Sequence, residues 1–141
     1  MASKADFTKD EWEALWKGVT GAGMLVSVAD RDFTDSFGEA SALAKRISEE
    51  RVTSASELLR ELAAGHGTGF GLTASPQKVE TETLEALRAA TATLAAKAPD
   101  ELGGYRHFVL DVADAVAEAK GGVKPGEAAA IDKVKEAVGA A

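Results

Sequence analysis

The stretch Thr8–Ala29, TKDEWEALWKGVTGAGMLVSVA, decides the fold of this chain. It opens with a capping box, because the Thr8 hydroxyl can accept the backbone N–H of Glu11 while the Glu11 carboxylate accepts that of Thr8. Apolar residues then recur at steps of three and four, so that they share one broad stripe of a helix. We therefore predict a long amphipathic helix. Its inward residues are Trp12, Leu15, Trp16, Val19, Leu25, Val26 and Ala29.

Three glycines, Gly18, Gly21 and Gly23, interrupt this stripe. Each glycine costs up to about 1 kcal/mol in a helix interior relative to alanine. Three of them so close together predict either a kink or a seam at which another helix approaches closely. The seam suits a partner helix that is rich in alanine.

The same two signals, polar caps and apolar periodicity, predict five more helices downstream. A capping box at Ser54 and Glu57 starts a short helix, which Gly65 ends in the left-handed conformation. Ser75 and Pro76 start another with a polar cap and a proline in the first turn. No segment has the pattern of a strand. The predicted helices cover residues 36–50, 54–64, 76–98 and 101–120 and the segment after Pro125.

Composition agrees with one all-α domain. The length of 141 residues suits a single hydrophobic core. Apolar residues make up 45% of the chain but aromatic ones only 6%, and alanine is the commonest residue, which favours closely packed helices over a sheet. We predict a single compact bundle of about six helices over residues 1–141, with a flexible N-terminus at 1–7 and a Gly-rich loop at 65–75.

Charge and residue usage exclude several classes of function. With 16 Lys and Arg against 23 Asp and Glu, the net charge is -7 and the basic residues form no patch that could bind nucleic acid. The absence of cysteine removes disulfides, thiolate metal sites and cysteine nucleophiles. No apolar run is long enough for a membrane span or a signal peptide, so we expect a cytoplasmic protein without a membrane partner.

The two histidines give little support to catalysis. His66 lies in the Gly-rich loop, which lacks the lysine of a phosphate-binding loop, and neither histidine follows a glutamate by three residues as in di-iron bundles. His107 shares a helical face with Asp111, Asp114 and Glu118, and we interpret this face as a solvated acidic stripe. We expect no enzymatic activity.

A cluster of carboxylates lies between the first two predicted helices. Asp30, Asp32, Asp35 and Glu39 fall within ten residues, and Ca²⁺, Mg²⁺ and Mn²⁺ prefer such clustered oxygens. The spacing is not that of an EF-hand, which needs glycine at its sixth position and glutamate at its twelfth. Two interpretations stay open: a divalent-cation site, or side chains that complement the positive N-terminus of the following helix.

This acidic turn has a counterpart in the second half of the chain. Residues 26–43 resemble residues 116–131, because each segment contains the end of a helix, a short turn with an apolar residue, and a helix that opens with glutamate. The similarity predicts two pseudo-repeated helical hairpins.

The sequence around both turns resembles the tellurite resistance protein B-like (TerB-like) family of small all-helical bacterial domains. The family pattern is Ala-x-x-Asp-Gly or Ala-Asp-Gly, then an aliphatic residue, then glutamate at the start of the next helix. Residues 120–127, KGGVKPGE, match the glycine, the aliphatic residue and the glutamate, with Lys120 where the pattern has aspartate. Residues 29–33, ADRDF, match the alanine and the aspartate and put Phe33 at the aliphatic position.

The resemblance implies an all-α protein of metal or oxyanion stress that binds divalent cations at helix ends and has no established catalysis. It selects Asp30, Asp32 and Glu39 in the first unit and Glu127 in the second, beside Asp35 of the acidic turn. We therefore expect a non-enzymatic binding or stress-response module with Ca, Mg or Mn as its cofactor. The alternative is an interaction domain, in which the glycine seam and both tryptophans pack against a protein partner or a second copy in a homodimer.

Overall fold

The described part of the chain is built from helices. A computed structural model describes residues 3–29, 36–65, 70, 75–119 and 125–139, and within these ranges it contains no strand. The predicted all-α bundle is therefore confirmed. The helices are η1, a short 3-10 helix (Lys4–Asp6), α1 (Lys9–Ala29), α2 (Ser36–Thr53), α3 (Glu57–Ala63), α4 (Pro76–Lys97), α5 (Pro99–Ala119) and α6 (Pro125–Val138).

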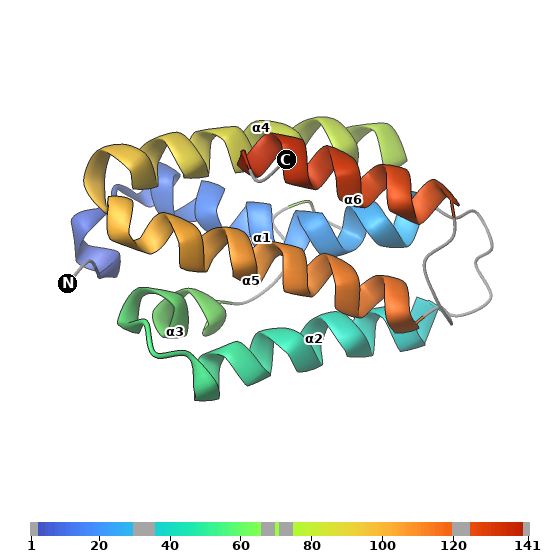
Figure 1. Ribbon diagram of the computed structural model, residues 1–141, viewed down its shortest axis with the longest axis horizontal. Coiled ribbons are helices and arrows are strands. Elements are labelled where there is room, and N and C mark those ends of the chain that lie inside the picture. The colour runs from blue at the N-terminus through green and yellow to red at the C-terminus, as the bar shows by residue number, and fades with distance from the viewer. Residues whose placement is uncertain (1–2, 30–35, 66–69, 71–74, 120–124, 140–141) are drawn as a thin grey trace.

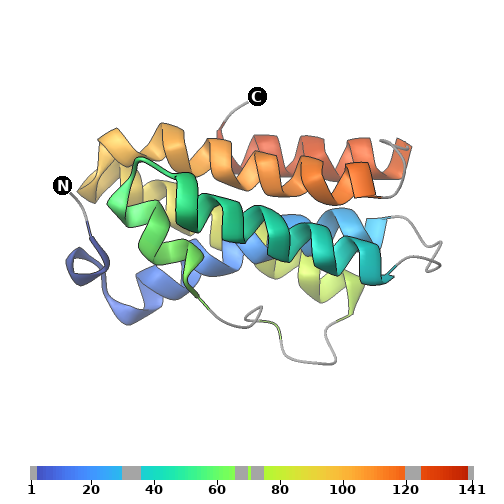
Figure 2. The same cartoon turned by 90° about the horizontal axis from the view of Figure 1, so that it is seen from below.

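Helix α1 is the centre of the bundle, and it contacts every other α-helix (Figure 1). It packs most extensively against α4 and then against α5. Helices α2 and α3 lie together at one edge, where α2 packs mainly on α5 (Figures 1 and 2). The ends of α1 and α5 and the starts of α2 and α6 lie at the same end of the bundle (Figure 1).

The predicted N-terminal caps of the long helices α1 and α4 are both present in the structure. Thr8 N–H donates to the Glu11 carboxylate at 2.8 Å, and Glu11 N–H donates to the Thr8 hydroxyl at 3.1 Å, which completes the capping box. Ser75 caps α4 by accepting the N–H of Lys78 at 3.2 Å, with Pro76 as the first helical residue. Local sequence thus fixes where α1 and α4 begin.

The three glycines of α1 form a seam, since the helix continues through all of them. A Cβ atom at Gly18 would lie 2.8 Å from Leu87 Cδ2, and one at Gly21 would lie 2.9 Å from Thr83 Cγ2. A Cβ at Gly23 would lie 2.7 Å from Leu43 Cδ1. The side chains that fill these positions are larger than the alanines we expected, because a glycine leaves room for a full side chain from the partner helix.

The seam sits in an apolar core to which α1, α3, α4, α5 and α6 contribute. Tyr105 is fully buried, and its hydroxyl donates to the Leu15 carbonyl at 2.7 Å, so that its polar atom is satisfied inside the core. The largest apolar side chains with no more than 1% exposure are Leu15, Leu58, Leu62, Leu87, Leu94 and Phe108.

The start of α3 differs from our prediction. Its N-cap is Ser56, whose hydroxyl accepts the N–H of Leu59 at 3.2 Å and donates to the Glu101 carboxylate of α5 at 2.6 Å. Ser54 instead accepts the N–H of Ser56 at 3.2 Å. The predicted N-cap, Ser54, was therefore wrong by two residues, because the hydrogen bond to Glu101 of α5 selects Ser56.

Three helix ends also differ from the prediction. Gly65 does not adopt the left-handed conformation, and α3 ends by i→i+3 bonds such as the one from Gly65 N–H to the Leu62 carbonyl at 3.1 Å. Among the described residues, the glycine with a left-handed backbone conformation is Gly139, which follows α6 and has a φ of 74°. Helix α2 runs to Thr53, past the predicted end at 50, and α5 begins at Pro99.

Aromatic side chains attach two segments for which we expected flexibility. Phe7 is 9% exposed, and its ring lies 5.9 Å from that of Trp12, so the N-terminal segment contacts the bundle. Within the Gly-rich loop, Phe70 is 5% exposed and belongs to the core. At the start of that loop, a Cβ on Gly65 would lie 3.0 Å from the Trp16 ring.

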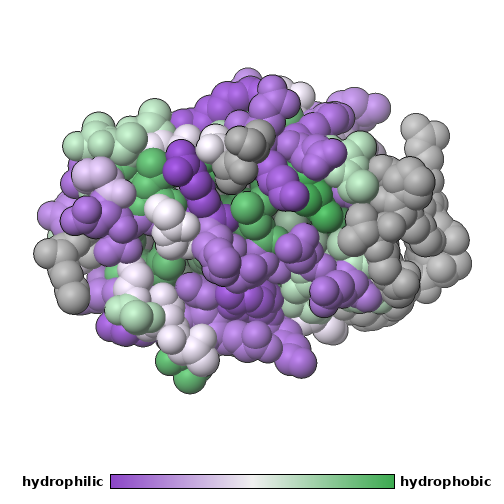
Figure 3. Space-filling model, in the orientation of Figure 1, coloured by the Kyte–Doolittle hydropathy of each residue, from purple (hydrophilic) through white to green (hydrophobic). Residues whose placement is uncertain are grey.

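The surface is mainly polar. On the face shown in Figure 3, hydrophilic residues cover most of the area, and apolar residues are visible mainly in the recesses between them. Among the described residues Val52, near the end of α2, is the large apolar side chain that is exposed, at 79%. In the part of the chain that the structure describes, no helix has the length and apolarity that a membrane crossing requires.

Candidate functional site

The five predicted metal ligands fall into two groups. Asp30, Asp32 and Asp35 lie outside the described residues, and Glu39 lies in the first turn of α2 with its side chain outside the description. Glu127 is described: it lies in the first turn of α6 and is fully buried. The structure therefore locates one carboxylate of the predicted set.

The residues next to the two predicted groups of ligands nevertheless lie close together. A Cβ on Gly126 would lie 2.9 Å from the carbonyl oxygen of Ala29, the last residue of α1. Gly126 directly precedes Glu127, and Ala29 directly precedes Asp30. The end of α1 and the beginning of α6 thus form a junction, and only a residue without a side chain fits at position 126.

A hollow of about 240 Å³ opens beside this junction between α1, α4 and α6. Its lining includes Ala29 and Gly126, and also Glu80 and Lys133, which form an ion pair. The remaining lining is mostly apolar, as with Leu25. Within the described ranges, no three Asp, Glu or His side chains are grouped so that they could hold a metal ion.

Glu127 is the most unusual ionisable group of the junction. Burial of a carboxylate is costly unless hydrogen bonds or a cation offset the lost hydration. Its position in the first turn of α6 provides part of this offset, because the N-terminus of a helix carries a partial positive charge.

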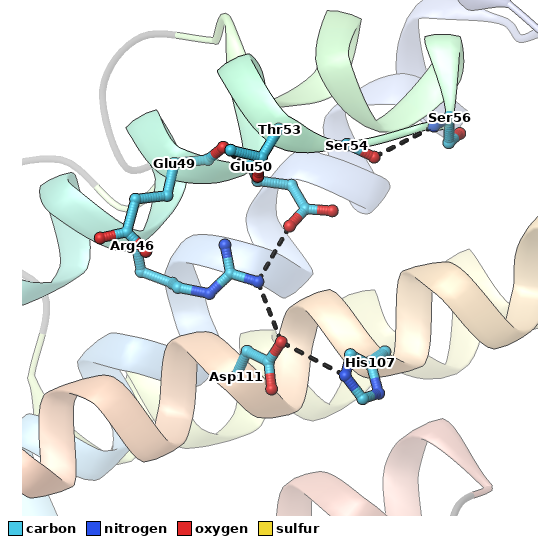
Figure 4. Close-up of polar contacts among 8 residues, drawn as sticks. All are labelled: Arg46, Glu49, Glu50, Thr53, Ser54, Ser56, His107 and Asp111. Atoms are coloured by element: carbon cyan, nitrogen blue, oxygen red, sulfur yellow. Dashed lines mark hydrogen bonds and ion pairs between the residues drawn. The ribbon is translucent and has the colours of Figure 1, made fainter.

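A second polar site lies between α2 and α5, as Figure 4 shows. The Arg46 guanidinium donates to the Glu50 and Asp111 carboxylates, each at 2.9 Å, and its carbon lies 5.7 Å from the centre of the Phe108 ring. Although burial opposes the charge, the hydrogen bonds to Asp111 and Glu50 outweigh it and raise the pKa of Arg46. One arginine thus bridges two carboxylates and holds α2 to α5.

His107 belongs to the same cluster, with its Nε2 3.5 Å from an Asp111 oxygen (Figure 4). Its side chain is 81% exposed, and Asp114 and Glu118 on the same helix face are also exposed. Partial burial raises the pKa of Asp114, and the nearby carboxylates add to that effect while Lys135 opposes it. The stripe is therefore solvated as predicted, except at Asp111, which the Arg46 bridge partly buries.

Arg46 was not among the residues predicted from the sequence. Its spacing of four residues from Glu50 is a visible signal for an ion pair within one helix. The bond to Asp111, 65 residues away, depends on how α2 docks on α5. We interpret the cluster as a contact that holds α2 against α5, because each of its positive groups is paired with a carboxylate.

A hollow of about 680 Å³ lies between α1 and α4. The Lys17 ammonium pairs with the Glu82 carboxylate across it and lies 4.8 Å from the centre of the buried Phe70 ring. The hydrogen bond from Lys17 lowers the pKa of Glu82. We call this hollow the α1–α4 groove; it is lined by Asp10, Glu13, Ala14, Trp16, Lys17, Glu82, Glu85, Ala86 and Ala89.

Comparisons of the chain with protein-family models, with curated proteins and with solved structures give no match. The resemblance to the TerB-like family therefore stays a prediction from the sequence motifs.

Proposed function

We propose that this chain is a non-catalytic binding module that holds a divalent cation where α1 ends and α6 begins. The observation that carries this proposal is the close approach of Gly126 to the Ala29 carbonyl, next to the fully buried Glu127. The sequence places Asp30, Asp32 and Asp35 immediately after Ala29. Glu127 and the acidic segment that follows Ala29 are far apart in the chain but therefore start from one point of the bundle.

The chemistry of this residue set suits a hard cation. Carboxylate oxygens are the preferred ligands of Ca²⁺, Mg²⁺ and Mn²⁺, and these ions need several of them at once. Glu127 would contribute from α6, and the aspartates and Glu39 would contribute from the segment that joins α1 to α2. Such an ion would hold the first helical hairpin to the second and would stabilise the bundle.

Titration with CaCl₂, MgCl₂ and MnCl₂, followed by calorimetry and thermal unfolding, tests the proposal. A ligand that binds only the native state at about 100 times its Kd adds about 2.7 kcal/mol to the free energy of unfolding. For a chain of this size we expect the Tm to rise by about 5–10 °C. No binding heat and no change in Tm at millimolar concentrations of all three ions would refute the cation site.

Variants locate the ion. Asp32→Asn and Glu127→Gln should each weaken binding about tenfold or more, as expected when one charged ligand of a hard cation is lost. Glu118→Gln, an exposed carboxylate on α5, is the matched control and should bind as the parent chain does. Lys120→Asp should strengthen binding, since it replaces a positive charge by the ligand of the family pattern.

A second candidate function is a protein-interaction module, and the α1–α4 groove favours it. Trp16 and Lys17 both line this groove, so one of the tryptophans that we assigned to an interface in the alternative prediction borders an open surface.

The resemblance adds an expectation of a role in metal or oxyanion stress, which growth of a deletion strain on tellurite would test.

A further inference from the structure

We propose that the α1–α4 groove is a docking site for a basic amphipathic helix of a partner protein. The groove is separate from the cation site. Its shape, the small side chains of its floor and the charge along its rim all suit such a helix.

The shape comes from two antiparallel helices that pack closely on their inner sides. The N-terminal half of α1 lies beside α4, with Lys97 of α4 bonded to Glu11 of α1 at 2.5 Å. On α1 the lining residues run from Asp10 to Lys17, and on α4 they run from Glu82 to Ala89. Each stretch covers two helical turns, or about 10 Å. This length is close to the diameter of a helix with its side chains, about 10–12 Å.

Small side chains form the floor of the groove. Ala14, Ala86 and Ala89 each present one methyl group where longer side chains would fill the space between the helices. Trp16 forms a half-buried aromatic wall, and its ring lies so close to Gly65 that a Cβ there would be 3.0 Å from it. An apolar side chain of a partner can therefore enter the groove and gain contact with methyl groups and an indole face, which is how amphipathic helices bind to grooves in general.

The charge of the rim selects the partner. Four carboxylates line the groove, from Asp10, Glu13, Glu82 and Glu85, against the single ammonium of Lys17. Lys17 points toward Phe70 and is bonded to Glu82, so its charge is already compensated. Glu13 pairs with Lys9 at 3.9 Å, and Glu82 also pairs with Lys78 at 3.8 Å. The carboxylates of Asp10 and Glu85 are therefore the groups that attract lysine and arginine side chains at the edges of a docked helix. A second copy of this chain, with a net charge of -7, would be repelled.

The probe that tests the proposal is a fluorescent model helix of about four turns, built from leucine, alanine and lysine. Fluorescence anisotropy with the full chain at about 0.1 M salt measures its affinity, and the same peptide with glutamate for lysine is the negative control. We expect binding of the basic peptide and no binding of the acidic one.

Two variants define the site, and one matched variant controls for net charge. Glu85→Lys reverses an exposed rim charge, and Ala89→Trp fills the floor from an exposed position; each should weaken peptide binding about tenfold or more. Glu118→Lys changes the net charge by the same amount as Glu85→Lys, but at an exposed position of α5. It should weaken binding less than about twofold. Circular dichroism checks that all three variants are folded.

Four results would overturn the proposal. One is the absence of peptide binding at about 1 mM. Another is an equal loss of affinity in Glu85→Lys and Glu118→Lys, which would indicate only attraction to the net charge. Displacement of the peptide by spermidine at similar concentration would indicate a small polycation as the occupant. A dimer in sedimentation that Ala89→Trp dissociates would indicate a second copy of the chain.

Discussion

The close packing at Gly18 predicts that one added methyl group destabilises the bundle. A Cβ atom there would overlap the Tyr105 hydroxyl and would lie 2.8 Å from Leu87 Cδ2. Tyr105 is fully buried, and its hydroxyl is bonded to the Leu15 carbonyl at 2.7 Å, so the ring has little room to retreat. The change Gly18→Ala therefore sets a better helix former against an overfilled core.

The opposing effects can be compared in size. Alanine gains about 1 kcal/mol over glycine in a helix interior, whereas overpacking a filled core costs about 1–3 kcal/mol. Moving the Tyr105 hydroxyl away from its buried acceptor adds a cost of about 1–3 kcal/mol. We expect Gly18→Ala to lower the free energy of unfolding by about 1–5 kcal/mol.

Gly103 provides the matched control, because it lies in α5 with nothing within 4 Å of the position of a Cβ. Gly103→Ala should raise the free energy of unfolding by up to about 1 kcal/mol. Urea unfolding followed by far-UV circular dichroism measures both changes. In a double-mutant cycle, Tyr105→Phe should relieve Gly18→Ala by about 0.5–3 kcal/mol. Equal stabilisation by both alanine variants would refute the close approach at Gly18.

Two further predictions concern the loop and the first helix. Phe70→Ala should lower the free energy of unfolding by about 3–5 kcal/mol, because it removes a buried ring from the core. An effect below about 1 kcal/mol in urea unfolding would contradict the buried position of Phe70. The hydrogen bonds from Lys97 and Thr8 lower the pKa of Glu11 below its ordinary value of 4.5, so the unfolded chain binds protons first and stability falls as pH decreases below that value. Glu11→Gln keeps the capping box but should reduce this acid dependence of the urea midpoint, whereas a dependence equal to that of the parent chain would contradict it.

The sequence was sufficient where a helix boundary depends on neighbouring residues. The capping box of Thr8 and Glu11 and the Ser75-Pro76 start both lie where we predicted them, because all of their bonds are made within one turn. The glycine pattern of α1 predicted either a kink or a seam, and the structure shows the seam. The pattern could not name the partner side chains, because those depend on which helices meet.

The errors arose where a distant residue decides between local alternatives. Ser54 and Ser56 are both suitable caps by type, and the Glu101 carboxylate on α5 selects Ser56. Phe70 lies among glycines, which predict a loop, yet one aromatic ring of that loop gains more by entering the core than by staying in water. The Arg46 bridge is the same case, since its second carboxylate comes from another helix.

The two proposed sites share α1 but should act independently. The groove uses α1 up to Lys17 and the junction begins at Ala29, so that twelve residues, or about 18 Å of helix, separate them. This separation exceeds the screening length of about 8–10 Å at physiological ionic strength. Glu85→Lys should therefore leave cation binding unchanged, and Glu127→Gln should leave peptide binding unchanged. A change in either affinity would require that both ligands favour the same rearrangement of α1, because coupling between distant sites needs a conformational equilibrium that both of them shift.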